Sequence, residues 1–127
     1  MTFRFDSSAV NSSELHCWPP MRVYNSERGA QWLAVADLVY LKGEENYTWL
    51  HWTNGQRVLV SYTLKRVEAK LPSTWFIRLH RHYMVNRQFI DRVEFTPAGV
   101  FVHLATGQAL PISRRRWSCI RKELIFH

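Results

Sequence analysis

The sequence lacks the apolar segments and clustered ligands that would place it among membrane proteins or metalloproteins. No apolar run approaches the roughly 18–20 residues of a membrane-spanning helix, and the opening MTFRFDSSAVNSSEL has no continuous apolar core of a signal peptide. The two cysteines, Cys17 and Cys119, stand far apart in no metal-ligand spacing, which fits a reducing cytoplasm. We therefore expect a cytoplasmic protein with no membrane insertion, no metal and no cofactor.

Acidic residues are scarce in most of the chain. The sequence has 17 Lys and Arg against 10 Asp and Glu, a formal net charge of +7. Residues 1–30 are neutral, so the whole excess lies in residues 31–127, where only seven acids occur. This bias favours a polyanionic partner such as nucleic acid, while the plainer interpretation is a basic domain charged for solubility. The absence of a carboxylate cluster for magnesium argues against a nuclease, so we expect no enzymatic activity.

What the chain does contain is a series of short apolar runs separated by turn residues. Three connections suit hairpins: 53–56 with Thr-Asn-Gly-Gln, 96–99 with Thr-Pro-Ala-Gly, and 106–108 with Thr-Gly-Gln. The spacing predicts a mainly β fold of small antiparallel sheets, not βαβ units. The expected strands are Gln31–Val35, Leu38–Leu41, Tyr47–Trp52, Val58–Tyr62, Trp75–His80, Phe89–Phe95, Val100–Leu104 and Ala109–Ile112.

Two segments have helical periodicity and are expected to cover the sheets as short helices. One spans residues 63–71, with Thr63 as its N-cap and Pro72 as its stop. The other spans residues 113–124, with Ser113 as its N-cap. Both are short and are expected to cover an edge or an end of the sheets.

The N-terminal region differs from the rest of the chain in its composition and in its lack of periodicity. Residues 1–16 are polar, rich in Ser and Asn and without periodicity, which predicts a loose tail. The Cys-Trp-Pro-Pro sequence at 17–20 predicts a bend anchored by a buried Trp18. We expect residues 1–30 to form a tail or arm of unknown role and residues 31–127 to form the functional domain.

The most informative stretch is WFIRLHRHYMVNR, from Trp75 to Arg87. Its first half predicts a buried strand, with Trp75, Ile77 and Leu79 facing the core and Arg78 bracing the sheet edge. Its second half presents His80, Arg81 and His82 as a polar, positively charged tip. A strand that only fills a core does not need such a tip, whereas an anion-binding strand does.

A second basic element follows at Ser113-Arg114-Arg115-Arg116. The N-terminus of a helix favours acids, so three arginines there are unfavourable by a few tenths of a kcal/mol each. A bound anion would reverse the sign, because unpaired N–H groups and Arg forks together form a phosphate site. In the alternative interpretation these arginines solvate the helix and pair with acids elsewhere.

Histidines and aromatic residues leave further alternatives open. His80 and His82, two positions apart, have a usable metal spacing and could also serve as the acid and base of a nuclease. Cys119, beside Ile120, is expected to be a buried small hydrophobe. Some aromatic residues could stack on single-stranded bases, as in OB-like binders, although in small β-domains they more often fill the core: Trp49, Trp52, Trp75, Phe76 and Phe101.

From about Trp32 to Leu124, five motifs resemble in order and spacing the LytTR DNA-binding domain of bacterial response regulators. The F-x-R-x-H-R-x-Y-x-V-N run is the most specific, and His82 departs from it, because the family usually has a small residue there. The motifs are VYLKGEENYT at 39–48, YTLK at 62–65 with Leu71, FIRLHRHYMVN at 76–86, Ile90, and LPISRR at 110–115.

The resemblance implies a regulator of transcription that binds duplex DNA through inter-strand loops, not through a recognition helix. The loops enter successive major grooves at tandem half-sites in promoters, so two copies are expected on DNA. Arg pairs with the edge of guanine and Asn with adenine, while other basic side chains hold phosphates. The base contacts expected are Asn46, Tyr47, His80, Arg81, His82 and Arg114. The backbone contacts expected are Lys42, Asn86, Arg87, Arg115 and Arg116.

The resemblance also raises the question of the input signal. Members of the family usually carry a receiver domain of more than a hundred residues before this module, and about 30 residues are too few for one. The expectation is a stand-alone regulator or an excised fragment. Its signal would come from a partner protein, from the expression level or from residues 1–30.

Overall fold

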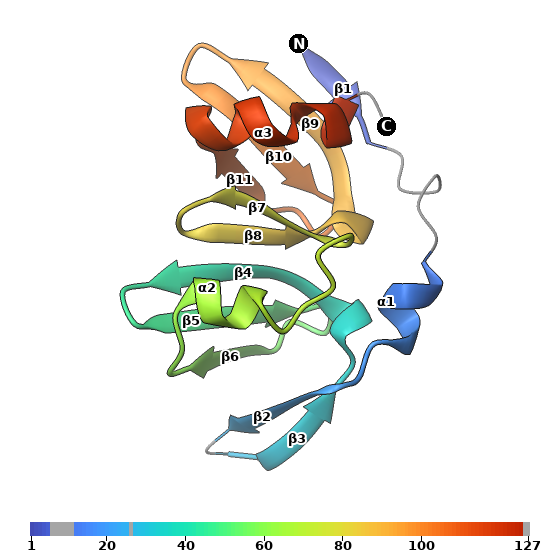
Figure 1. Cartoon of the computed structure of the whole chain (residues 1–127), viewed down its shortest axis with the longest axis vertical. Coiled ribbons are helices and arrows are strands. Elements are labelled where there is room, and N and C mark those ends of the chain that lie inside the picture. The colour runs from blue at the N-terminus through green and yellow to red at the C-terminus, as the bar shows by residue number, and fades with distance from the viewer. Residues whose placement is uncertain (6–11, 26, 126–127) are drawn as a thin grey trace.

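The chain folds into short strands arranged in sheets that are stacked along one axis (Figure 1). The computed structural model describes residues 1–5, 12–25 and 27–125. The mainly β fold of small antiparallel sheets that the sequence predicts is confirmed. The elements are β1 (Thr2–Arg4), α1 (Ser13–Cys17), β2 (Met21–Asn25), β3 (Gly29–Leu33), η1 (Val35–Asp37), β4 (Leu38–Glu44), β5 (Tyr47–Trp52), β6 (Arg57–Val60), α2 (Leu64–Glu68), β7 (Phe76–His80), β8 (Tyr83–Asn86), η2 (Arg87–Phe89), β9 (Ile90–Thr96), β10 (Gly99–Leu104), β11 (Ala109–Ile112) and α3 (Arg114–Ile125).

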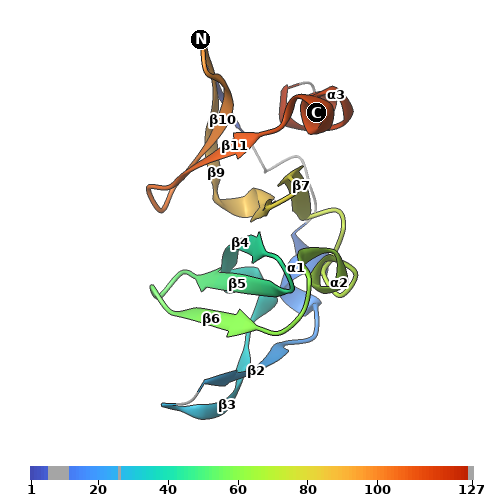
Figure 2. The same ribbon diagram turned by 90° about the vertical axis from the view of Figure 1, so that its left-hand side faces the viewer.

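The described strands pair antiparallel in three groups. A five-stranded sheet of order β6-β5-β4-β8-β7 lies in the middle, between a four-stranded sheet of order β1-β9-β10-β11 and the β2–β3 hairpin (Figure 1). A view turned by 90° shows α2 and α3 on the same side of the molecule (Figure 2). No helix in the described residues is long and apolar enough to cross a membrane.

The signals that start the helices and turn the hairpins act as the sequence predicts. The hydroxyl of Thr63 accepts a hydrogen bond from the backbone N–H of Arg66 at 3.3 Å, which caps α2. The hydroxyl of Ser113 accepts one from the backbone N–H of Arg116 at 3.2 Å, which caps α3. Gly55 turns the β5–β6 hairpin at φ +83°, a conformation that other residues rarely adopt.

Two hydrophobic clusters cover the two faces of the five-stranded sheet. Phe76 of β7 belongs to the cluster closed by α1 and α2, whereas Ile77 and Leu79 belong to the cluster closed by α3 and the four-stranded sheet. The three side chains are 4%, 3% and 0% exposed. Each such burial contributes about 1.5–3 kcal/mol. β7 is therefore fixed from both sides, and Trp75, just before it, is buried as predicted.

The N-terminal segment differs from the expected loose tail. β1 pairs with β9, with Phe3 opposite Val93, and α1 buries Leu15 to 1% exposure. The expectation is therefore wrong for these two elements, because partners distant in sequence order them; residues 6–11 lie outside the described part. Trp18 is half-buried, and its indole N–H donates to the carbonyl of Lys70 at 3.0 Å, so the bend after α1 is anchored.

Burial decides two of the alternatives left open by the sequence. Trp52, Trp75 and Phe76 are 5%, 2% and 4% exposed, so they form core and are closed to bases. The expected burial of Cys119 is wrong, because this thiol is exposed. An α-helix turns by about 100° per residue, so a neighbour of the buried Ile120 points well away from the core.

Candidate nucleic-acid interface

Three segments far apart in the sequence meet along one edge of the molecule. They are the turn between β4 and β5, the turn between β7 and β8, and the start of α3, all at the left in Figure 1. The backbone N–H of Gly43 donates to the carbonyl of His82 at 2.8 Å, and that of Ser113 donates to the carbonyl of Leu79 at 3.0 Å. These hydrogen bonds hold the β7–β8 hairpin against the end of β4 on one side and against the start of α3 on the other. We call this surface the basic edge; its residues are Lys42, Asn46, Tyr47, His80, Arg81, His82, Arg114, Arg115 and Arg116.

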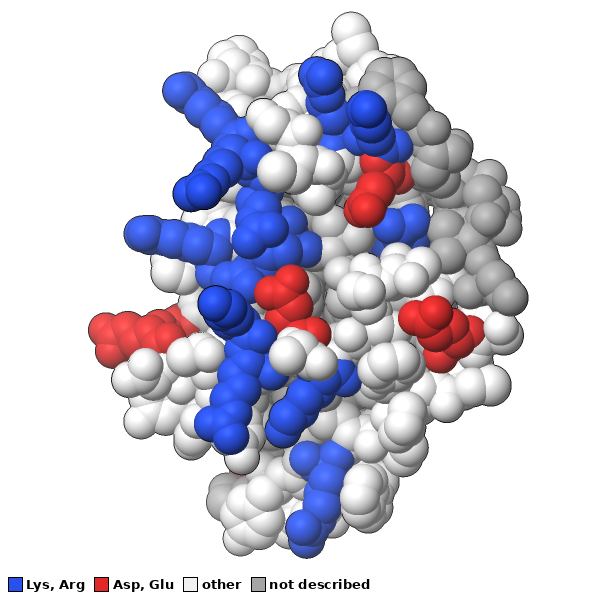
Figure 3. Space-filling model, in the orientation of Figure 1, with Lys and Arg blue, Asp and Glu red and all other residues white. Residues whose placement is uncertain are grey.

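Positive charge dominates the basic edge. Lys and Arg side chains gather along the left of the space-filling view, with few acidic groups between them (Figure 3). Arg81, Arg114, Arg115 and Arg116 are exposed, and none of the four forms an ion pair with an acid in the described part of the chain. The alternative pairing of the α3 arginines with acids is therefore not seen in these residues. Unpaired guanidinium groups on one surface attract an anion.

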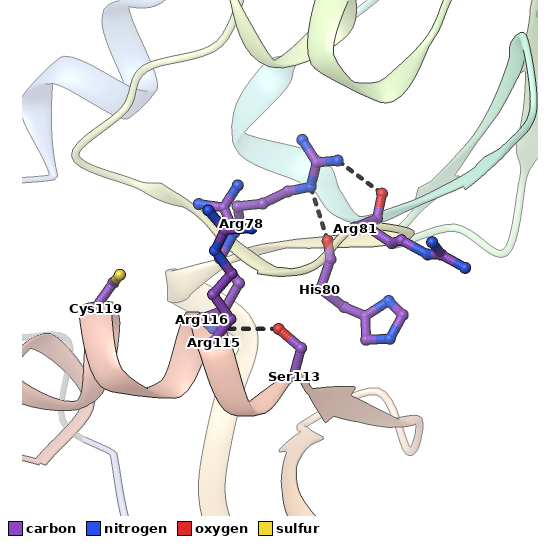
Figure 4. A pocket seen from close by; sticks show the side chains of 7 residues that line it. All are labelled: Arg78, His80, Arg81, Ser113, Arg115, Arg116 and Cys119. Atoms are coloured by element: carbon purple, nitrogen blue, oxygen red, sulfur yellow. Dashed lines mark hydrogen bonds between the residues drawn. The ribbon is translucent and has the colours of Figure 1, made fainter.

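A hollow of about 730 Å³ separates the β7–β8 turn from the start of α3 (Figure 4). Guanidinium groups approach it from both sides, and the capping hydroxyl of Ser113 lies at its rim. Arg forks combined with the N-terminus of a helix suit a phosphate oxygen. The lining residues are Arg78, His80, Arg81, Ser113, Arg115, Arg116 and Cys119.

The turn between β4 and β5 forms the other side of the interface. Glu45 adopts φ +52° at its apex, Asn46 is exposed, and Tyr47 is 49% exposed. A smaller hollow of about 250 Å³ lies between this turn and the β7–β8 turn, lined by Glu45 and Arg81 among others. Lys42 is partly neutralised, because its ammonium lies 3.4 Å from Glu44.

A hydrogen bond joins the two histidines of the β7–β8 turn. Nδ1 of His80 accepts a hydrogen bond from the backbone N–H of His82 at 3.1 Å, which leaves Nε2 of His80 as the nitrogen that donates. Nε2 of His82 accepts from Nε of Arg81 at 3.2 Å. Burial, together with electrostatic interactions with His82, Arg81 and Arg78, lowers the pKa of His80 below its ordinary value of 6.5 and so favours the neutral imidazole. No group of three or more potential metal ligands occurs among the described residues.

The expected DNA backbone contacts of Asn86 and Arg87 are wrong, because both side chains are buried at 0% and 6% exposure. The amide of Asn86 donates to the carbonyls of Ala36 at 3.3 Å and Leu38 at 2.9 Å. Its carbonyl oxygen accepts from the backbone N–H of Gln88 at 3.0 Å. Arg87 pairs with Glu123 of α3 at 3.4 Å. Both residues join parts of the fold and do not face a ligand.

Sequence reasoning missed one pair that shapes the interface. Arg78 lines both hollows, and it pairs with Glu68 of α2 at 2.7 Å. Glu68 is a single acid in the short helix α2, and nothing in its local sequence marks it as part of the site. Only the packing of α2 beside β4 brings the two together.

Comparisons with known proteins identify relatives of this chain. The family model described as LytTr DNA-binding domain matches residues 31–125. The positive alginate biosynthesis regulatory protein of Pseudomonas aeruginosa is 27% identical over 100 residues, which cover 76% of this chain and 40% of that protein. The sensory transduction protein LytT of Enterococcus faecalis is 30% identical over 84 residues, which cover 65% of this chain and 35% of that protein.

A solved structure shows the same fold. The LytTr DNA-binding domain of a response regulator from Bacillus cereus superposes with a TM-score of 0.73 at 23% identity, covering 82% of this chain and 94% of that one. The chain spans 40% or less of the length of the two named relatives. Since the family model covers most of the sequence, the chain belongs to the LytTR family of DNA-binding domains.

Proposed function

We propose that the chain regulates transcription by binding duplex DNA sequence-selectively through the basic edge. Asn46, Tyr47, His80, Arg81, His82 and Arg114 reach base edges in the major groove. Lys42, Arg115 and Arg116 hold phosphates, which set register without reading sequence. A base-reading Arg contributes about 1–3 kcal/mol of discrimination.

One observation carries the proposal. Arginines without an ion-pair partner among the described acids lie on two segments, held by backbone hydrogen bonds, on either side of a hollow of about 730 Å³. A protein that needed these charges only for solubility would spread them over its surface. Here Arg115 and Arg116 rise from the start of α3 toward Arg78, and Arg81 extends from the β7–β8 turn in another direction (Figure 4). This arrangement suits a DNA backbone that passes between a turn and a helix start, with side chains on both sides able to enter a groove.

The target we propose is a pair of tandem half-sites, each bound by one copy of the chain. Loop side chains of the basic edge would enter successive major grooves along the site, which recur about every 34 Å along B-DNA. Family membership is the support for this arrangement, together with the placement of the turns along one edge. A signalling protein would supply the input.

A binding titration tests the proposal. Fluorescence anisotropy would compare a duplex selected from a random pool with scrambled duplexes and with each single strand. The expected result is tighter binding to the selected duplex. Equal binding to single strands, or cleavage of the DNA in the presence of metal, would instead support a single-strand binder or a nuclease.

The two exposed cysteines offer a chemical test of where DNA binds. Cys119 lines the hollow, whereas Cys17 lies at the end of α1, at the opposite side of the fold (Figure 1). Bound duplex should slow alkylation of Cys119 and leave Cys17 unchanged, as mass spectrometry of the alkylated peptides would show. Equal rates at Cys119 with and without saturating DNA would place the DNA elsewhere.

A further inference from the structure

Arg78 is a basic residue of the interface that does not point freely toward solvent. Its side chain is 12% exposed, although it lies beside both hollows. Its Nε donates to the carbonyl of His80 at 2.8 Å, and its Nη2 donates to the carbonyl of Arg81 at 2.7 Å (Figure 4). The guanidinium group therefore holds two successive carbonyls of the β7–β8 turn.

The third bond of Arg78 ties this turn to a helix. Nη1 donates to the carboxylate of Glu68 at 2.7 Å. α2 itself sits closely on β4, since a Cβ added at Gly43 would lie 3.0 Å from the Cβ of Leu64. Leu64 therefore packs directly against the backbone of β4, and this packing places Glu68 beside the guanidinium group of Arg78.

The opposite side of the same turn is held by β4. The backbone N–H of Gly43 donates to the carbonyl of His82 at 2.8 Å. The three consecutive carbonyls of His80, Arg81 and His82 are thus bound by donors from two directions. Arg78 uses three separate nitrogens for two carbonyls and a carboxylate, whereas a lysine carries all its donors on one nitrogen and cannot reproduce this fork.

We propose that Arg78 is a positioning residue for sequence reading, which, with Glu68, fixes the backbone from which His80, Arg81 and His82 meet the bases. This inference rests on the proposed function. Three of the five N–H donors of Arg78 are used inside the protein, and Arg78 is assigned neither a base contact nor a phosphate contact. It acts through Arg81, whose guanidinium must lie within hydrogen-bond distance of a base edge.

The test compares Arg78→Lys and Glu68→Gln with Arg66→Gln, a control on α2 whose guanidinium lies over the ring of Tyr62. For each variant, affinities for the selected duplex and for scrambled duplexes give a selectivity ratio. Loss of folded protein lowers both affinities equally, so the ratio isolates positioning from stability. We expect the ratio to fall about tenfold or more for Arg78→Lys, the loss of one well-placed base contact, and to stay unchanged for Arg66→Gln.

The salt dependence supplies the second readout. If Arg78 acts as proposed, the slope of log affinity against log salt keeps its wild-type value in Arg78→Gln. A slope smaller by about 0.9 would make Arg78 a phosphate contact and overturn the inference. An unchanged selectivity ratio in both Arg78→Lys and Glu68→Gln would also overturn it. Failure of the wild-type chain to select any duplex sequence would instead overturn the proposed function.

Discussion

Arg81 and Asn86 lie close together in the β7–β8 hairpin, yet the side chain of Arg81 faces solvent and that of Asn86 is buried. Arg81 is exposed in the β7–β8 turn and forms no ion pair with a described acid. Asn86, at the end of β8, is fully buried and uses its side chain to bind backbone groups of η1, β4 and η2. Both residues belong to the motif through which the family is recognised.

The contrast shows that one motif carries two physical requirements. The exposed half offers unpaired charge to a ligand, and the buried half keeps the strands that support it in register. Substitutions in the two halves should therefore separate stability from DNA binding.

The largest effect is expected from Asn86→Ala. The change removes the hydrogen bonds to two buried carbonyls and to one part-buried backbone N–H, at about 1–3 kcal/mol for each buried group left unsatisfied, so we expect a loss of about 3 kcal/mol or more. Denaturant unfolding followed by tryptophan fluorescence measures it. Asn46→Ala is the matched control, because Asn46 is exposed in the β4–β5 turn; equal stability losses in both variants would contradict the comparison.

The next largest effect is expected from Arg81→Gln and Arg114→Gln. Each should weaken binding to the selected duplex by about 1–3 kcal/mol and leave binding to scrambled duplexes much closer to wild type. Unfolding free energies should remain at the wild-type value, since both side chains are exposed. A uniform loss of affinity across all duplexes would assign these arginines to phosphates.

Arg115→Gln should have a smaller effect, visible mainly in salt. Removing one phosphate contact lowers the slope of log affinity against log salt by about 0.9, with selectivity retained. Arg92→Gln is the control, because Arg92 lies on β9 and is paired with Asp91 at 2.9 Å. If the slope is unchanged in Arg115→Gln, Arg115 is not a phosphate contact.

The smallest effect concerns the pH dependence of stability. Burial, with the nearby charges of Arg57 and Lys42, lowers the pKa of His51 below 6.5, and the pKa of His80 is lowered as well. The unfolded chain therefore binds more protons below pH 6.5, so the free energy of unfolding decreases as pH falls through this window. His51→Gln should flatten the dependence, as denaturant unfolding at several pH values would show. A dependence identical to that of the wild type would assign it to other groups.

Much of the fold follows from local sequence signals. β5 and β11 have the bounds that alternation and turn residues predict, and the hydroxyls of Thr63 and Ser113 cap the predicted helices. β1 was not predicted, because three residues carry little pattern and depend on β9 for pairing.

The candidate site was less accessible to local reasoning. Asn86 looks like a phosphate contact beside Arg87, but its partners are carbonyls 50 and 48 positions earlier in the chain. The pairing of Glu68 with Arg78 likewise depends on how α2 packs. Composition and spacing identify which residues are polar, whereas only the three-dimensional arrangement shows which way they point.

Selection from a randomised duplex pool, followed by sequencing, tests the central claim most directly. The wild-type chain should enrich a defined motif, and Arg81→Gln should lose part of that motif while remaining folded. Enrichment of no sequence by the wild type, or an identical motif from Arg81→Gln, would contradict the account of a basic edge that reads bases.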